Sequence, residues 1–155
     1  MSGALEIHDM PGHLIRRLQQ ISVSVFAERV AEAGYDVTPV QYAALVAISA
    51  NPGIDQATLA GLIAHDRVTI GGVLDRLEQK SMIARETSAR DRRARILHMT
   101  REGEDALSSL TPVVQSVQLE ILGGLDESER ETLLALLKKT TEAGNTLSRA
   151  PLKTG

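Results

Sequence analysis

The sequence predicts a mainly α-helical fold with one small β-hairpin. Along most of the 155 residues, apolar side chains recur at spacings of three and four, which is the period of one buried helix face. One segment, residues 82–99, departs from this period and contains two short runs typical of strands. Aromatic residues make up 2% of the chain and Trp is absent, so the core has to consist of aliphatic side chains.

The first predicted helix runs from Pro11 to about Ala33. Pro11 suits the first turn of a helix, and Gly34 ends the segment. The apolar stripe of this helix consists of Leu14, Leu18, Ile21 and Val25.

The next helices predict a helix-turn-helix. Thr38-Pro39-Val40-Gln41 combines a capping Thr, a Pro at the first helical position and a Gln that completes a capping box. That helix stops at Asn51-Pro52-Gly53. Asp55 then caps a short helix, and after a turn at Ala64-His65 we expect Asp66 to cap a second one. Its buried face holds Ile70, Val73, Leu74 and Leu77, and its other face would enter a major groove.

A basic hairpin follows directly. The predicted strands are Met82–Glu86 and Ala94–Met99. Between Lys80 and Arg101 seven cations face two carboxylates, a net charge of +5 in a chain whose total is −3. Such a hairpin can place a guanidinium in the negative minor groove. The sequence therefore predicts a winged helix-turn-helix, although a charged hairpin alone is also compatible with a solvated surface.

The C-terminal third predicts dimerisation helices. Thr100-Arg101-Glu102-Gly103 opens a long helix, Asp126 opens the last one, and we expect the tail Ala150–Gly155 to fray. The long helix has a coiled-coil-like seam of Leu107, Leu110, Val114, Val117 and Ile121. We expect this seam to pair with a second copy, the alternative being packing within one subunit. The expected domains are residues 1–35 (N-terminal dimerisation helix), 36–100 (winged helix-turn-helix) and 101–155 (C-terminal dimerisation helices).

The candidate DNA-binding residues lie on the outward face of the second helix and on the hairpin. They are Arg67, Val68, Thr69, Gly71, Gly72, Arg76, Arg90, Asp91, Arg92 and Arg93. Arg67 can donate to guanine, and a methyl group of Val68 or Thr69 can touch thymine. The two glycines cost about 1 kcal/mol each in a helix. They indicate either close approach to a sugar-phosphate backbone or a tight helix–helix contact. Asp91 is expected to position the wing, with Arg76 as its partner.

The chain resembles the MarR family of bacterial regulators over nearly its whole length. The matching segments are Thr38-Pro39-Val40-Gln41-Tyr42, Asn51-Pro52-Gly53 with Leu59-Ala60, Asp66-Arg67-Val68-Thr69-Ile70, Leu74-Asp75-Arg76-Leu77-Glu78, Asp91-Arg92-Arg93 and Met99-Thr100-Arg101-Glu102-Gly103. The resemblance implies a triangular homodimer that binds a palindromic DNA site. Two positions depart from the family pattern: Ser81 replaces a glycine before the first wing strand, and Gly71-Gly72 replace a commoner Thr-Arg.

Members of this family often bind small anionic aromatic compounds, and this binding releases DNA. The segment Pro11–Arg17 looks like a subgroup linked to aromatic-acid catabolism. Arginine can hold a carboxylate through two parallel hydrogen bonds. The candidate ligand residues are therefore His13, Arg16 and Arg17, with Tyr42 lining the pocket. The alternatives are that both arginines are solvated or paired with acidic residues, and that Tyr42 belongs to the core.

Several function classes are disfavoured. The absence of Cys excludes a disulfide scaffold and a thiol redox switch. His8, His13, His65 and His98 lack metal-ligand spacing, no catalytic or phosphate-loop motif is present, and no cofactor is expected. Without a signal-peptide pattern or a long apolar run, we expect a cytoplasmic protein that does not act on membranes. The favoured function is a DNA-binding repressor released by an aromatic carboxylate or phenol. A regulator without a ligand, or a protein-interaction module, is the alternative.

Overall fold

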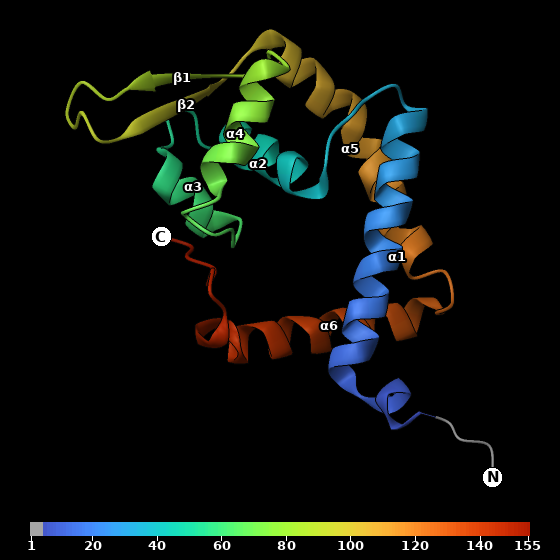
Figure 1. Cartoon of the computed structure of the whole chain (residues 1–155). Helices are drawn as coiled ribbons and strands as arrows, with labels where there is room; N and C mark the ends of the chain where they lie inside the picture. The colour runs from blue at the N-terminus through green and yellow to red at the C-terminus, as the bar shows by residue number, and fades with distance from the viewer. Residues whose placement is uncertain (1–4) are drawn as a thin grey trace.

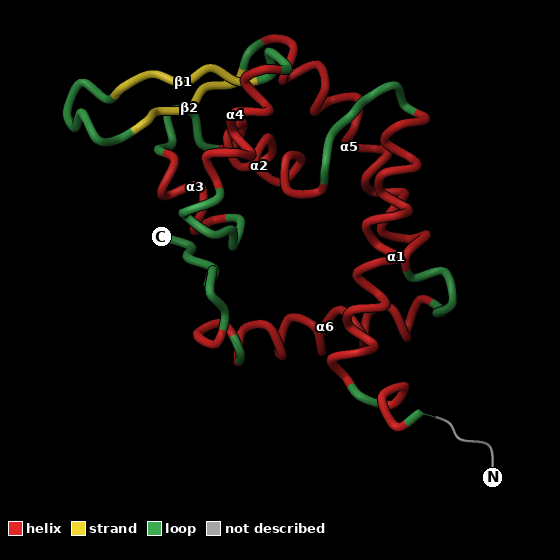
Figure 2. Tube along the Cα trace, in the orientation of Figure 1, coloured by secondary structure: helices red, strands yellow, loops and turns green. Residues whose placement is uncertain are grey.

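The computed structural model describes residues 5–155. Residues 1–4, which form part of the N-terminal segment without a signal-peptide pattern, lie outside the described residues. Figures 1 and 2 show a compact head and two long helices that run away from it. The elements are a short 3-10 helix Glu6–Asp9, α1 Pro11–Glu32, α2 Pro39–Ala50, α3 Gln56–Leu62, α4 Ile70–Gln79, β1 Ile83–Thr87, β2 Arg95–Met99, α5 Arg101–Ile121, α6 Glu127–Ala143 and a 3-10 turn Asn145–Leu147. The predicted helical fold with one hairpin is confirmed. None of the described helices combines the length and apolarity needed to span a bilayer.

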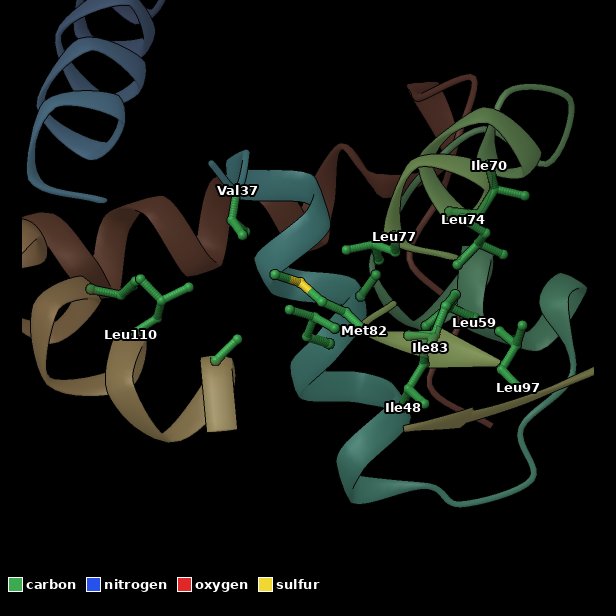
Figure 3. Close-up of a cluster of buried hydrophobic side chains, with 14 of the residues drawn as sticks. Val37, Ile48, Leu59, Ile70, Leu74, Leu77, Met82, Ile83, Leu97 and Leu110 are labelled. Carbon is green, nitrogen blue, oxygen red and sulfur yellow. The ribbon is translucent and has the colours of Figure 1, made fainter. Parts of the chain in front are cut away.

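The head is built from α2, α3, α4 and the hairpin around an aliphatic core. Leu59 of α3, Ile83 of β1 and Leu97 of β2 point toward one another in Figure 3, and all are buried. Among the described residues, Phe26 is the one aromatic side chain in the fully buried core. The capping box predicted for α2 is present, because Gln41 N donates to Thr38 Oγ1 and Thr38 N donates to Gln41 Oε1.

The junction between the hairpin and α5 requires a glycine. Thr100 caps α5 by accepting a hydrogen bond from Gly103 N at 3.0 Å. A Cβ on Gly103 would lie 2.0 Å from the carbonyl oxygen of Met82, so the first turn of α5 fits against the chain before β1 only without a side chain. This contact sets the direction in which α5 leaves the head.

The centre of the apolar seam of α5, from Leu110 to Val117, packs within its own chain, so the prediction that these residues pair with a second copy is wrong. Leu110 and Val117 are fully buried in one cluster with Phe26 and Val30 of α1. The helices α1 and α5 lie side by side (Figure 1). Arg29 of α1 also donates to Glu120 of α5 at 2.7 Å and 2.9 Å. Periodicity reveals that a helix face is buried, but it does not reveal which chain covers it.

The C-terminal tail is docked, which contradicts the expectation that it frays. Lys153 N donates to the carbonyl oxygen of Gly61 in α3 at 2.8 Å. The Asn145 side chain accepts from Leu152 N at 2.8 Å and donates to Leu152 O at 3.0 Å. These bonds satisfy backbone groups that a frayed tail would leave to water. Figure 1 shows the tail turning from α6 back toward α3.

Candidate nucleic-acid interface

The first helix of the helix-turn-helix is held by its cap. Asp55 accepts from Thr58 N at 2.8 Å and from Thr58 Oγ1 at 2.6 Å. The hydrogen bond from the Thr58 hydroxyl lowers the pKa of the Asp55 carboxyl, so the group stays ionised where α3 begins. Leu59 and Ala60 of this helix are fully buried in the core of the head.

The second helix of the helix-turn-helix, α4, begins one turn later than predicted. Asp66 accepts from Val68 N at 2.8 Å through its side chain, and its carbonyl accepts from Thr69 N at 3.2 Å and Ile70 N at 3.0 Å. These bonds form a tight turn, and α4 starts only at Ile70. Arg67, Val68 and Thr69 therefore project from the turn before the helix. All three are exposed, Val68 to 89%.

The outward face of α4 is open at both glycines. A Cβ on Gly71 would meet only Gln56 Nε2 at an ordinary contact distance of 3.5 Å, and a Cβ on Gly72 would meet nothing within 4 Å. The tight helix–helix contact considered for these glycines is therefore absent from the described chain. Arg76 lies exposed further along the same helix.

The wing is an antiparallel hairpin with a second anchor on the head. Ile83 pairs with Met99 and Thr87 with Arg95 at the two ends of the ladder. On its other edge β2 is bonded to the segment before α3, because Leu97 N donates to Ile54 O at 2.9 Å. The hairpin is therefore rigidly continuous with the helix-turn-helix.

Asp91 shapes the wing loop through the loop's own backbone. Its carboxylate accepts from Arg93 N at 2.9 Å, and its N–H donates to Ser88 Oγ at 3.3 Å. The partner proposed for Asp91 was wrong, because no bond or ion pair joins Asp91 to Arg76 in the described residues. A short loop can use its own backbone donors, whereas Arg76 projects from a separate element.

Arg85 and Lys80 are structural residues of the basic segment that the sequence reasoning missed. Arg85, with its side chain 12% exposed, donates to Asp75 at 2.5 Å and to Glu78 at 3.2 Å and 3.3 Å, and so ties β1 to α4. Its hydrogen bond lowers the pKa of the Glu78 carboxyl. Lys80 donates to the carbonyl of Asp36 and to the buried Gln41 amide. Two carboxylates three residues apart on α4 were the available signal for Arg85.

The remaining arginines of this region form no ion pair with the described part of the chain. Within residues 5–155, no ion pair involves Arg67, Arg76, Arg90, Arg92, Arg93 or Arg95. The residues that line a hollow of about 470 Å³ between the wing and α3 include three arginines, Arg67, Arg93 and Arg95, and two carboxylates, Asp55 and Asp91. The wing and the exposed turn thus carry guanidinium groups that can bind the phosphates of a DNA duplex.

The four candidate ligand residues do not meet within one chain. Arg16 donates to His13 Nδ1 at 3.3 Å, and Arg17 lines a separate shallow hollow with Gln20 and Ile21. Tyr42 of α2 packs edge-on against Phe26 and donates to Thr111 Oγ1 at 3.3 Å. Phe26 lies about two and a half turns along α1 from Arg17, so Tyr42 is far from the three other candidates.

The histidines are dispersed over the described chain. His65 contacts Thr69 at 3.2 Å, and His98 contacts Glu86 at 2.8 Å in the wing. The rings of His8 and His13 are 5.7 Å apart. Residues 5–155 contain no group of three or more side chains arranged to hold a metal ion.

Comparison with known proteins identifies relatives along most of the chain. The family model described as "MarR family" matches residues 35–94. A putative transcriptional regulatory protein for the hcr operon of Thauera aromatica is 37% identical over 139 residues, which cover 90% of this chain and 80% of that protein. The transcriptional regulator HosA of Escherichia coli is 36% identical over 104 residues, 67% of this chain and 77% of that protein.

Solved structures of similar proteins share the fold. PcaV of Streptomyces coelicolor, in complex with its natural ligand, gives a TM-score of 0.82 at 30% identity over 91% of this chain and 98% of that one. The transcriptional repressor CouR, bound to a 23-mer DNA duplex, gives 0.80 at 27% identity over the same shares. BpsR of Bordetella bronchiseptica, whose DNA binding is regulated by 6-hydroxynicotinic acid, gives 0.79 at 26% identity over 86% and 94%.

Proposed function

The chain belongs to the MarR family of transcriptional regulators, and on that premise we propose that it is a homodimeric repressor released from a palindromic operator by a small aromatic carboxylate. Regulators of this family bind DNA. The observation that carries the proposal is the group of unpaired arginines on the wing and on the turn before α4, none of which is engaged by the described protein residues.

Each part of this surface has a distinct task in the proposed complex. Arg93, with Arg90 and Arg92 beside it, enters the minor groove or contacts its phosphates. Arg67 reads a base edge from the turn before α4. Gly71 and Gly72 allow the helix to approach the sugar-phosphate backbone, since neither is needed for packing in the chain.

A second copy covers the apolar surface that one chain leaves open. No side chain of α6 is buried, and Leu134, Leu136 and Leu137 are each at least 41% exposed. An apolar groove of about 770 Å³ lies between α1, α5 and α6. Ile15 of α1 and Leu119 of α5 line this groove, and Leu14 and Ile21 are further exposed apolar residues of α1. Residues 1–35 and 101–155 are accordingly the proposed dimerisation segments, and residues 36–100 the DNA-binding domain.

The ligand site is proposed to form between two protomers. BpsR responds to an aromatic carboxylate, which supports the same chemical class here. His13, Arg16 and Arg17 lie in the N-terminal half of α1, where apolar side chains such as Ile15 are exposed. Tyr42 lies beside α5. In the dimer, the cations of one protomer complete a pocket lined by Tyr42 of the other. The charged donors offset the desolvation of a buried carboxylate.

Binding to the chain's own promoter region tests the DNA-binding function. Fluorescence anisotropy with labelled promoter fragments should show tight binding by the wild type. Arg93→Ala should weaken it by about 1–3 kcal/mol because the substitution removes a guanidinium from the groove. Lys139→Ala, which removes the same charge from α6, should bind normally provided that sedimentation velocity shows it to be a dimer like the wild type. Equal affinities of the wild type and Arg93→Ala would contradict the proposed contact between the wing and DNA. If the wild type binds no duplex, a protein-interaction module becomes the better hypothesis.

Titration calorimetry with hydroxybenzoates, cinnamates and 6-hydroxynicotinic acid tests the ligand. One compound should bind the wild type and release the promoter fragment, since a ligand shifts only an equilibrium whose states it distinguishes. Arg16→Ala and Arg17→Ala should weaken its binding, whereas Lys139→Ala should not. A compound that binds all variants equally places the pocket elsewhere. If none of the panel binds, the regulator without a ligand becomes the better hypothesis.

A further inference from the structure

The docked tail places two cations beside the turn that precedes α4, residues 66–69. Lys153 is fixed through its backbone bond to Gly61, at the C-terminal end of α3. Arg149 lies 3.5 Å from Asp66, the residue that shapes the turn before α4. The Arg149 side chain is 92% exposed, so this ion pair is weak in water and its guanidinium can exchange to another anion.

Gly61 makes room for this segment. A Cβ at Gly61 would lie 3.0 Å from Lys153 Cβ, which is tighter than an ordinary contact, and Lys153 atoms are the neighbours nearest to it. Glycine destabilises a helix by about 1 kcal/mol relative to alanine. The tail therefore supplies a physical reason for a glycine in the seven-residue helix α3.

Arg67 stands between the tail and the wing. It lines the hollow that it shares with Arg93 and Arg95 of the wing, and it also lines a second hollow of about 400 Å³ with Arg149 and Lys153. The second hollow is lined by three cationic side chains and one acidic side chain, that of Asp66, and Gly155 also lines it. The cationic surface of the wing thus continues past Arg67 onto the C-terminal segment.

We propose that the docked C-terminal segment is part of the DNA interface, in which Arg149 and Lys153 contact backbone phosphates on the side of Arg67 away from the wing. This proposal rests on the proposed DNA-binding function. A duplex presents one phosphate charge per about 1.7 Å of its axis, so a surface continuous with the wing faces further phosphates. Such contacts are independent of base sequence and add affinity and salt dependence.

The salt dependence of DNA binding tests the proposal. The probe is a labelled mixed-sequence duplex as long as an operator with two half-sites. Anisotropy titrations with it give the slope of log K against log salt concentration. In Arg149→Gln/Lys153→Gln the slope should become shallower by about 0.9 for each phosphate that the protein no longer neutralises, or about 1.8 per protomer, with weaker binding. Gly61→Leu, which keeps every cation but fills the space of Lys153, should shift the slope in the same direction.

Two controls separate the possible outcomes. Lys138→Gln/Lys139→Gln removes the same charge from α6 and, once sedimentation velocity shows that it is a dimer like the wild type, should leave the slope unchanged; an equal change in that dimeric variant would overturn the proposal in favour of a general charge effect. An unchanged slope in Arg149→Gln/Lys153→Gln also overturns it, and weaker binding at an unchanged slope would mean that the tail only positions the head. If the wild type binds no duplex, the proposed DNA-binding function itself fails.

Discussion

At the scale of single residues, three helices end in the same backbone arrangement but with different residues at its left-handed position. Gly34 fills this position after α1, whereas Ala64 and Ser81, with φ of 51° and 59°, fill it after α3 and α4. After α4, Met82 N donates to Leu77 O and Ser81 N to Glu78 O, the two bonds of a Schellman motif. Non-glycine residues bear a steric cost there that Gly34 avoids.

Ser81→Gly is therefore expected to stabilise the protein by about 0.5–1 kcal/mol. The relief of the left-handed strain, about 1–2 kcal/mol, exceeds the extra chain entropy that glycine loses on folding, about 0.5–1 kcal/mol. The bonds of the motif come from the backbone and stay intact. Urea denaturation measures the change. Ser22→Gly in the middle of α1 is the control and should lower stability, and a Ser81→Gly midpoint at or below that of the wild type would refute the argument.

Residue patterns predicted some local structures and missed others for identifiable reasons. Thr38 and Gln41 form the predicted capping box because the two residues lie three positions apart, and the Gln41 side chain accepts from Thr38 N while it also accepts from Lys80. Asp66 also bonds the backbone as a cap does, but its carbonyl closes a tight turn first, so α4 begins later. Local sequence identifies a capping residue more securely than the conformation of the residues that follow it.

At the scale of elements, α3 is a seven-residue helix whose start depends on one carboxylate. The Asp55 side chain satisfies both Thr58 N and the Thr58 hydroxyl. An isolated helix of this length is marginal in water, so its cap and its burial have to hold it in place. The turn before α4 and the anchor of the wing both adjoin this helix.

Asp55→Ala is expected to cost about 1 kcal/mol of stability near neutral pH through loss of the cap. The folded-state pKa of Asp55 is lowered below the ordinary value of 3.8. Its contribution is therefore present above about pH 3.8 and is lost as the pH falls through the folded pKa. Urea denaturation of the wild type and Asp55→Ala should give a stability difference that shrinks in this acidic window.

Asp55→Asn is the matched control for the charge. It retains an acceptor for Thr58 N, so it should lose less stability than Asp55→Ala near neutral pH. Because the amide does not titrate, its stability relative to Asp55→Ala should stay constant through the acidic window. A difference between wild type and Asp55→Ala that persists unchanged below the folded pKa would contradict the assigned pKa shift.

The elements themselves were predictable, but their partners were not. The spacing of Leu110 and Val117 identified a buried face of α5, and α1 proved to cover it. Arg85 belongs to a basic run whose other arginines form no ion pair with residues 5–155, and only the fold places Arg85 against Asp75 and Glu78. Long-range pairing depends on the path of the chain, which a local pattern does not contain.

At the scale of the whole molecule, the head, which we propose binds DNA, is joined to an arm formed by α1, α5 and α6. Part of the apolar surface of this arm is exposed in the single chain. The head has a complete core, whereas α6 has no buried side chain. Leu110 closes the packing of the arm within the chain, and Leu134 lines the apolar groove between α1, α5 and α6. Substitutions at these two leucines should therefore have different effects.

Leu134→Glu is expected to yield a folded monomer, because its charge would lie in the proposed interface but in solvent when the chain is alone. Sedimentation velocity should show the loss of the dimer while circular dichroism stays helical, and binding to two half-sites should weaken. Leu110→Glu should instead unfold the chain, since it buries an unpaired charge at a cost of several kcal/mol. A dimeric Leu134→Glu protein would place the interface elsewhere.

The packing of α1 against α5 also fixes the order in which the molecule can be completed during synthesis. Arg29 and Glu120, which join the two helices, are 91 residues apart in the chain. At about 5–20 residues per second, the ribosome makes Glu120 roughly 5 to 20 seconds after Arg29. The head is contiguous in sequence and can fold in that interval, while the sides of Phe26 and Val30 that face α5 remain uncovered. The nascent chain therefore exposes this apolar stripe to chaperones and proteases until α5 has left the ribosome.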